Sequence, residues 1–262
     1  MNGLVIRDGA RIPPGLRRIG RLVRVVAHIG RGLWLALRFD AFRQPHRALV
    51  REQALRWQQD LLEILGVRLT VSGKPAAGTV LHVSNHVSWL DIPVIGSLVP
   101  VHFLSKAEVR QWPLVGWLAL AAGTLFIRRG SGESGSKAQE IAAHLQQRRT
   151  ILVFPEGTTT DGTGVRRFFP ALFKAAVAAG TPVQPLTLQY LDHRGDVDRS
   201  LAFVGDDRFH SHLWQLLLRD EIRVNIHFGA LLMADDGDHR ALALRAQREV
   251  AATMAPAGIP HA

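Results

Sequence analysis

The segment Asn85-His86-Val87-Ser88-Trp89-Leu90-Asp91 has residue types and a spacing suited to acid–base chemistry. A histidine with a carboxylate five positions later can act as a base with an orienting partner. The carboxylate of Asp91 would accept a hydrogen bond from one ring nitrogen of His86 and leave the other free to take a proton. A regular helix turns through about 140° over this step, so the pairing requires an irregular turn at His86. Without that turn, His86 merely ends a strand and Asp91 lies in the following helix.

Further polar groups stand where predicted strands end. Lys106 follows one strand, Arg128 and Arg129 end the next, and the Phe-Pro-Glu-Gly-Thr segment 154–158 ends another. Ligands of parallel α/β sheets gather at the carboxyl ends of the strands, so these groups can share a pocket with His86. Adjacent strand residues point to opposite faces, so at most one of the two arginines enters it; alternatively, both belong to a solvated strand end. This set suits an acceptor that has a hydroxyl and an anionic group.

From residue 67 onward the sequence alternates short apolar strands with helices, which predicts an α/β fold with one central, largely parallel sheet flanked by helices. The predicted strands are Val67–Val71, Thr79–Val83, Val101–Leu104, Thr124–Ile127, Ile151–Phe154, Val183–Tyr190, Leu201–Val204 and Ile222–Phe228. The predicted helices are Leu90–Gly96, Glu108–Ala121, Lys137–Arg148, Pro170–Ala179, His212–Leu218 and His239–Met254. The Gly/Ser-rich segment 130–136 is predicted to be a mobile loop. It lacks the lysine–serine ending of a phosphate-binding loop, so no bound nucleotide is expected.

The N-terminal residues 1–60 are strongly basic. They hold twelve arginines against four acidic residues, which places eight of the ten net positive charges of the chain there. Between Leu16 and Phe39, nine apolar residues fall on one side of a helical wheel and six arginines on the other. A second amphipathic stretch follows Pro45. We therefore expect an N-terminal two-helix segment, residues 1–66, that lies on an anionic membrane surface. The alternative is a pair of ordinary amphipathic helices packed on the core.

Composition excludes several classes of protein. The 262 residues contain no cysteine, which rules out thiolate zinc sites and a cysteine nucleophile. The histidines lack compact ligand spacing, so no metal is expected. Aromatic residues make up only 7% and no nucleic-acid-binding motif is present, so no nucleic-acid partner is expected. The longest uncharged stretch, Gln111–Ile127, contains Pro113 and two glycines and is better explained by a buried helix and a strand than by a membrane span. The remaining domains are an α/β domain, 67–254, and a flexible tail, 255–262.

Four segments together resemble the motif blocks of the glycerolipid acyltransferases in order and spacing. They are Asn85-His86-x4-Asp91, residues 123–129, residues 154–158 and the Thr-Pro-Val-Gln-Pro segment 181–185. The resemblance covers about residues 67 to 205 and is strongest to the 1-acyl-sn-glycerol-3-phosphate acyltransferases. It implies transfer of a fatty acyl group from acyl-CoA or acyl-carrier protein to the hydroxyl of a lysophospholipid. It implies no metal, no cofactor and no covalent acyl-enzyme. With the basic helices, it predicts peripheral or monotopic attachment to the cytoplasmic face of the inner (plasma) membrane.

The resemblance also assigns roles to residues. His86 matches the general base and Asp91 its partner. The substrate-binding residues that it implies are Asn85 in the first block, Lys106 beside the thioester, Arg128 and the phosphate-contacting Arg129, and the acceptor-binding Glu156, Gly157 and Thr158.

The sequence departs from the family pattern at two places. Arg128 stands where many members have Asp, and Thr158 is followed by Thr-Thr instead of the commoner Arg-Ser, so one expected cation is missing. Arg166 and Arg167 are the candidates to replace it. These changes resemble a bacterial subgroup that includes lyso-ornithine lipid acyltransferases. The favoured acceptor is 1-acyl-sn-glycerol-3-phosphate, which would give phosphatidic acid; the alternatives are a lyso-ornithine lipid or a non-enzymatic protein that binds anionic lipid.

Overall fold

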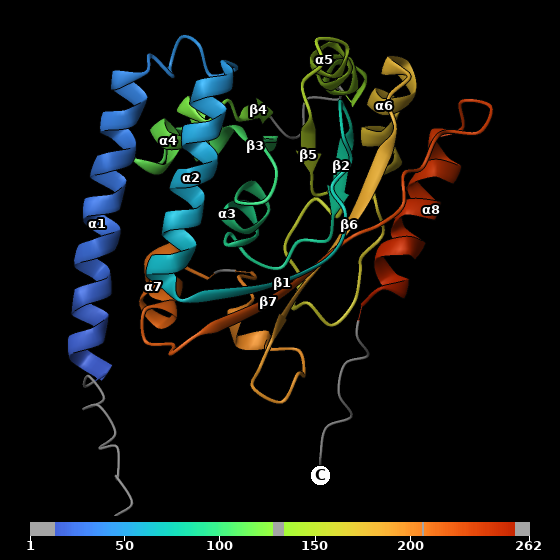
Figure 1. Cartoon of the computed structure of the whole chain (residues 1–262). Coiled ribbons are helices and arrows are strands. Elements are labelled where there is room, and N and C mark those ends of the chain that lie inside the picture. Colours follow the sequence, from blue (N-terminus) through green and yellow to red (C-terminus); the bar gives the residue numbers. More distant parts are fainter. Residues whose placement is uncertain (1–13, 128–133, 206, 255–262) are drawn as a thin grey trace, which may run out of the picture.

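The computed structural model describes residues 14–127, 134–205 and 207–254, and within them seven strands form one sheet in the order β1-β7-β6-β2-β5-β3-β4 (Figure 1). The strands are β1 (Val67–Gly73), β2 (Leu81–Ser84), β3 (His102–Lys106), β4 (Leu125–Ile127), β5 (Ile151–Val153), β6 (Val183–Leu191) and β7 (Ile222–Phe228). Strands β6, β2, β5, β3 and β4 run parallel to one another, whereas β7 pairs antiparallel with β6 and parallel with β1. The predicted α/β fold with a largely parallel sheet is confirmed.

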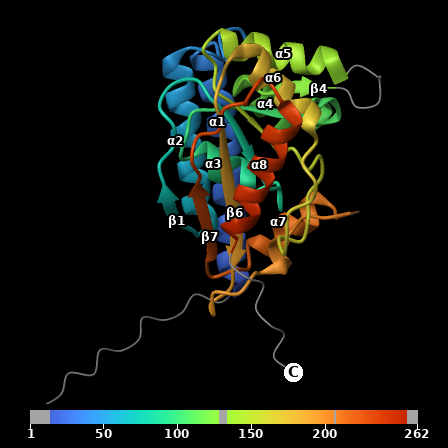
Figure 2. The same ribbon diagram turned by 90° about the vertical axis from the view of Figure 1, so that its right-hand side faces the viewer.

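Helices cover both faces of the sheet. They are α1 (Pro14–Arg38), α2 (Ala48–Leu65), α3 (Asp91–Gly96), α4 (Val115–Ala121), α5 (Ser134–Gln146), α6 (Lys174–Ala179), α7 (Phe209–Leu216) and α8 (His239–Ala252), with short 3₁₀ helices η1 (Ala107–Gln111), η2 (Pro170–Phe173) and η3 (Arg199–Leu201). One apolar core joins the sheet to α1, α2, α3 and α7, and a second joins it to α5, α6 and α8. Figure 2 looks onto the second layer, with α8 in front of β6. Strand β6 lies between the two cores, which explains why eight of its nine residues are buried.

Three predicted elements are wrong in detail. The predicted strand Leu201–Val204 is instead the end of η3 and an irregular segment. There the side chain of Asp198 accepts from the backbone of Ser200, and the Phe203 N–H donates to the carbonyl of Val87. The predicted helix Glu108–Ala121 is divided into η1 and α4, because Pro113 cannot continue a helix through its middle. The predicted loop 130–136 lies partly outside the described residues, and its last three residues are already helical.

The N-terminal helices pack against the sheet. Val25 of α1 and Leu62 and Leu65 of α2 belong to the same buried core as β6 and β7. Gly66 ends α2 with φ 74°, a left-handed conformation that favours glycine, and β1 begins at the next residue. The division into segments 1–66 and 67–254 stays a prediction, and the predicted tail 255–262 lies outside the described residues. Among the described helices, none combines the length and the apolar character needed to cross a bilayer.

The two faces of α1 differ from the prediction in one respect. Six large apolar side chains remain exposed along the helix: Leu16, Ile19, Val23, Val26, Trp34 and Leu37. We call this set the apolar stripe of α1. The arginine side, however, is partly occupied by protein. Arg17 and Arg21 donate to backbone carbonyls that follow α7, and Arg18 stacks over Trp214. These three arginines therefore dock α1 on the domain, and the expectation that all six face lipid phosphates needs this correction.

Candidate active site

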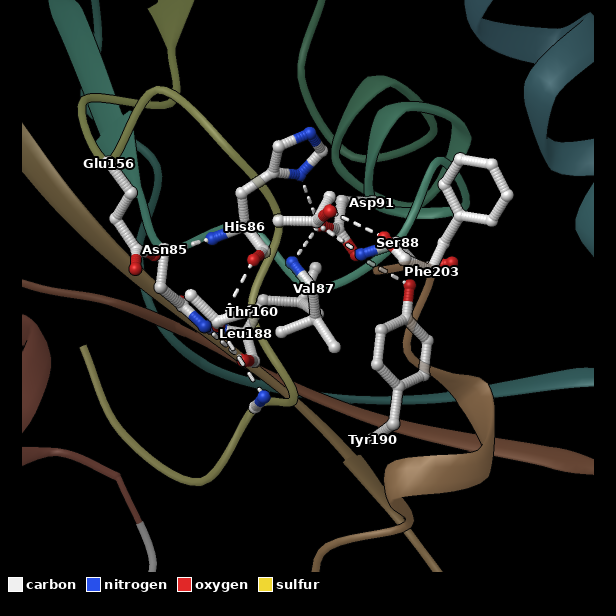
Figure 3. A network of polar contacts seen from close by, with 12 residues as sticks. Asn85, His86, Val87, Ser88, Asp91, Glu156, Thr160, Leu188, Tyr190 and Phe203 are labelled. Carbon is white, nitrogen blue, oxygen red and sulfur yellow. Dashed lines mark hydrogen bonds and ion pairs between the residues drawn. The ribbon is translucent and has the colours of Figure 1, made fainter. Parts of the chain in front are cut away.

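His86 and Asp91 form the pair that their spacing predicts. Nδ1 of His86 lies 2.7 Å from Oδ2 of Asp91, and Figure 3 shows the other ring nitrogen on the side away from the carboxylate. Residues 85–88 are irregular and α3 begins only at Asp91, so the required turn is present. Because a carboxylate accepts, the proton lies on Nδ1 and Nε2 keeps its lone pair. The ring of Phe154 stacks on the imidazole with centroids 3.9 Å apart. Asp91 and Phe154 thus hold the ring of His86, and the second ring nitrogen is available to take a proton.

Asp91 is fully buried, and its two oxygens have four partners (Figure 3). Besides His86, Oδ2 accepts from the backbone N–H groups of Val87 at 2.7 Å and Ser88 at 3.0 Å. Oδ1 accepts from the hydroxyl of Tyr190 at 2.7 Å. Burial and the neighbouring carboxylate raise the pKa of Tyr190 well above its ordinary value, so its hydroxyl keeps the proton that it donates. These donors stabilise a buried charge that would otherwise be costly, and they fix the orientation of the carboxylate.

Strand β6 and the loop after β5 hold the turn of residues 85–90 in place. Because this turn carries the candidate base, we call it the catalytic turn. Asn85 is buried and its amide pairs with the backbone of Leu188 in β6, donating at 2.8 Å and accepting at 2.8 Å. Its side chain therefore continues the sheet where β2 ends. The carbonyl of His86 accepts from the N–H of Thr160 at 2.8 Å, which attaches the turn to the loop after β5. Within the described residues, the Asn85 amide is engaged by protein, so its predicted part in substrate binding remains a prediction.

Glu156 also connects the catalytic turn to the loop after β5. Its carboxylate is buried and accepts from the backbone N–H of His86 at 2.9 Å and of Arg166 at 2.8 Å. Burial raises the pKa of Glu156, although the two N–H donors oppose that effect. Gly157 follows with φ 71°, which lets the chain turn sharply at this point. Glu156 thus fixes the loop of residues 157–166 against the catalytic turn; its direct contact with an acceptor stays a prediction.

His86 lies in the wall of a cavity of about 1290 Å³. Residues of α1, α2, α3, η1, α4 and α7 line it, together with the segments that follow β2 and β5, and most of these residues are apolar. The cavity therefore offers an apolar volume that begins at the base and extends between the N-terminal helices and the sheet domain. A volume of this kind suits a long hydrocarbon chain better than a small polar substrate.

Three cationic side chains line the same cavity and remain exposed: Lys106, Arg166 and Arg167. We call them the cationic rim. Among the ion pairs between described residues, none involves any of the three. Gly157 and Thr158 also line the cavity, as the sequence predicted for the acceptor block. Arg128 and Arg129 lie outside the described residues, so their predicted role is not placed. Across the described ranges, no three histidine or acidic side chains gather closely enough to hold a metal ion.

Sequence reasoning missed two residues of the site. Tyr190 is embedded in an apolar strand almost one hundred positions from Asp91, and nothing local distinguishes it from a core aromatic residue. Phe154, which stacks on His86, was treated only as part of the segment that ends β5. Among the tryptophans near the site, Trp89 and Trp112 line the cavity, whereas Trp117 is 58% exposed.

Comparison with known proteins places this geometry in a family. The model of the acyltransferase family matches residues 68–189. A lyso-ornithine lipid O-acyltransferase of Pseudomonas aeruginosa is 43% identical over 238 residues, which are 90% of this chain and 91% of the relative. The chain belongs to the acyltransferase family. The sequence-based expectation of an O-acyltransferase of the glycerolipid type is confirmed, and the matched residues include the His86–Asp91 pair.

Other relatives of this acyltransferase carry a different name. A 1-acyl-sn-glycerol-3-phosphate acyltransferase of Neisseria meningitidis is 30% identical over 200 residues, covering 74% of this chain and 78% of the relative. The crystal structure of the 1-acyl-sn-glycerophosphate acyltransferase PlsC from Thermotoga maritima superposes with a TM-score of 0.65 at 21% identity, over 90% of this chain and 93% of that one. At this identity the likeness shows a shared fold.

Proposed function

We propose that this acyltransferase moves a fatty acyl group from a thioester, acyl-CoA or acyl-carrier protein, to the hydroxyl of a lyso-ornithine lipid, with His86 as general base. The observation that carries the proposal is an imidazole whose Nδ1 is committed to Asp91 while the ring borders an apolar cavity. Such a base can activate an alcohol at the end of a lipid chain. The cavity has room for the chain itself.

The reaction follows from that arrangement. Nε2 of His86 takes the proton of the acceptor hydroxyl as its oxygen attacks the thioester carbonyl. Asp91 stabilises the imidazolium that forms. The tetrahedral intermediate then collapses, the carbon–sulfur bond breaks, and the leaving thiolate takes the proton from Nε2. General-base catalysis of this kind contributes about 10²- to 10⁴-fold. We assign Lys106 to the thioester, and Arg128 and Arg129 with Asn85, Gly157 and Thr158 to the acceptor side; no cofactor is required.

Two acceptors are supported to different degrees. The relative that is 43% identical over nine tenths of the chain is named for the lyso-ornithine lipid, and the departures after Thr158 point to the same subgroup. The second candidate is 1-acyl-sn-glycerol-3-phosphate, which the more distant Neisseria relative is named for. Its phosphate would suit the cationic rim. We place the lyso-ornithine lipid first, which reverses the order that the motif blocks favoured.

The test is an acyl-transfer assay with the purified full-length protein. Each acceptor is offered separately with acyl-CoA or acyl-carrier protein, and thiol release and diacyl product are measured. We expect turnover with the lyso-ornithine lipid and a loss of at least about 10³-fold in His86→Ala, because both the base and its imidazolium vanish. His86→Ala with an unchanged circular dichroism spectrum and near-normal turnover would reject His86 as the base. Turnover with the phosphate acceptor alone would exchange the two candidates.

We further propose that α1 attaches the protein to an anionic membrane surface, on the cytoplasmic side. Helix α1 lies at the edge of the molecule (Figure 1), and the side chains of its apolar stripe are exposed. Arg24 and Arg38 flank it on one side of the helical wheel, where they can meet lipid phosphates, whereas Arg31 pairs with Asp60 of α2. Val25 and Ile29 of the same helix line the cavity, so we propose that a lipid acceptor reaches His86 from the bilayer.

Flotation with vesicles of anionic lipid tests this attachment. We expect Val23→Gln combined with Val26→Gln to reduce vesicle binding about tenfold, because the two changes remove exposed apolar contacts with lipid. Turnover of a short-chain, soluble acceptor should be unchanged, since neither side chain lines the cavity. Undiminished vesicle binding would show that another surface attaches the protein.

A further inference from the structure

Three aromatic rings form one wall of the cavity beside the catalytic turn. Trp89 lies between His86 and Asp91 in the sequence, Phe209 begins α7, and Trp112 follows η1. The rings of Trp89 and Phe209 have centroids 4.9 Å apart at 58°, and those of Trp112 and Phe209 are 6.2 Å apart at 57°. All three residues line the cavity. We call this set the aromatic wall. Its rings are inclined to one another and border the same cavity.

The position of Trp89 is fixed by a buried histidine of α7. The indole Nε1–H of Trp89 donates to Nδ1 of His212 at 2.9 Å, and His212 is 4% exposed. Only a neutral imidazole can accept at Nδ1, and burial lowers the pKa of His212 and favours that form. The ring of Phe203 packs on His212 with centroids 5.4 Å apart, and the Phe203 N–H donates to the carbonyl of Val87. The segment before α7 and the catalytic turn are therefore joined at two places.

The chemistry of this wall differs from that of the cationic rim. The faces of aromatic rings carry negative electrostatic potential and attract ammonium groups within about 6 Å of the ring centroid. The carboxylate of Asp207, two residues before α7, lies close enough to His212 to oppose the effect of burial on its pKa. Asp207 accepts a backbone hydrogen bond from Val204 but takes part in no ion pair between described residues. Because Asp207 is exposed and does not line the cavity, the attraction for a cation at this wall comes from the rings, whereas the rim attracts an anion.

We propose that Trp89, Phe209 and Trp112 form the subsite for a positively charged headgroup of the acceptor, and that His212 is the positioning residue that holds Trp89 in it. This inference rests on the proposed function, since ornithine carries a side-chain ammonium and a carboxylate, whereas 1-acyl-sn-glycerol-3-phosphate carries no cation. The subsite then selects the zwitterionic acceptor. The aromatic wall binds the ammonium, and the cationic rim is left for the carboxylate.

Paired acceptors test the wall. Turnover of a lyso-ornithine lipid is compared with that of the same lipid acetylated on its side-chain amine, which removes the charge and keeps the chain. We expect the wild type to prefer the free amine by about 2- to 30-fold in kcat/KM, the range that cation–π contacts give. Trp112→Leu should remove most of this preference, whereas Trp112→Phe keeps a ring and should retain most of it. Trp117→Leu, at an exposed tryptophan outside the cavity lining, should match the wild type.

The outcomes separate this inference from the acceptor assignment. Wild-type turnover of the lyso-ornithine lipid without preference for the free amine would overturn the subsite and leave the acceptor standing. Equal losses with both acceptors in Trp112→Leu would also overturn it, because the ring would then line the path of a hydrocarbon chain. Turnover of 1-acyl-sn-glycerol-3-phosphate alone would overturn both.

The role of His212 is tested by a pair of substitutions. Asn offers an acceptor oxygen near the position of Nδ1, and Leu offers none. We expect His212→Leu to raise the KM for the lyso-ornithine lipid about tenfold with kcat within twofold, and His212→Asn to restore most of the KM. The KM for the acetylated acceptor should stay unchanged in both. Equal effects of Leu and Asn, or a fall in kcat with both acceptors, would reduce His212 to a packing residue.

Discussion

The surroundings of Asp91 and the cationic rim border the same cavity, but their polar groups are partnered in opposite ways. Asp91 is fully buried and its oxygens accept from His86, Tyr190 and two backbone N–H groups. Lys106, Arg166 and Arg167 are exposed and form no ion pair with any described residue. Under the proposed function, the difference means that the reacting group is positioned before substrate arrives, whereas the charges assigned to substrate binding are left available.

The largest effect is expected from a substitution of Asp91, the centre of the fully hydrogen-bonded region. We expect Asp91→Asn to lower kcat by about 10³- to 10⁴-fold, because an amide no longer holds the proton on Nδ1 and no longer stabilises the imidazolium. Steady-state kinetics at saturating acceptor measure the effect, with thermal denaturation as the control for folding. Retention of more than a tenth of the wild-type kcat would show that the carboxylate is structural.

An intermediate effect is expected from a substitution of Tyr190, the hydrogen-bond partner of Asp91 that sequence reasoning missed. Tyr190→Phe removes only a hydroxyl and leaves Oδ1 of Asp91 buried without that donor. A hydrogen bond to a charged group contributes about 1.5–3 kcal/mol, so the folded protein should lose stability of this order and kcat should fall about tenfold. The acceptor KM should not change. An unaltered kcat together with lower stability would limit Tyr190 to a role in folding.

The smallest effect should come from the cationic rim. Arg166→Gln and Arg167→Gln should each raise the acceptor KM about five- to tenfold with kcat unchanged, because an exposed cation binds ground state and transition state alike. Added salt should raise the KM of the wild type in the same direction and have less effect on the variants. A fall in kcat at constant KM would assign these arginines to the transition state instead and weaken the contrast with Asp91.

The local sequence pattern was sufficient to predict the His86–Asp91 pair but not the residues from other elements that surround it. The spacing of His86 and Asp91 identified both residues and even required the irregular turn that separates them. Tyr190 and His212 reach the catalytic turn from β6 and α7, and their contacts depend on how distant segments pack. A buried tyrosine in an apolar strand and a histidine on a helix face look like ordinary core residues in sequence. Side-chain type alone does not tell which group they contact.

In the fold, too, local patterns were predictable, whereas long-range contacts were not. Strand β7 has the predicted bounds Ile222–Phe228, because alternating burial leaves a period of two in its sequence. The apolar run Leu201–Val204 has strand-like composition, yet its backbone donates to Val87 in the catalytic turn instead of joining the sheet. The arginines of α1 were assigned to lipid from helical periodicity, but Arg17 and Arg21 contact carbonyls that follow α7. In both cases a tertiary partner, and not local propensity, decided the conformation or the contact.

By itself the sequence determined the class of fold, the four motif blocks and the histidine that we propose as the base, since each is carried by residues a few positions apart. Only the tertiary structure decided that Asp91 is held by Tyr190, that Glu156 connects the backbone of two loops, and that three aromatic rings face the cavity beside His86. The physical reason is that hydrogen bonds and ring contacts act over a few ångströms in space. Contacts between residues far apart in the sequence therefore leave no local pattern from which they could be predicted.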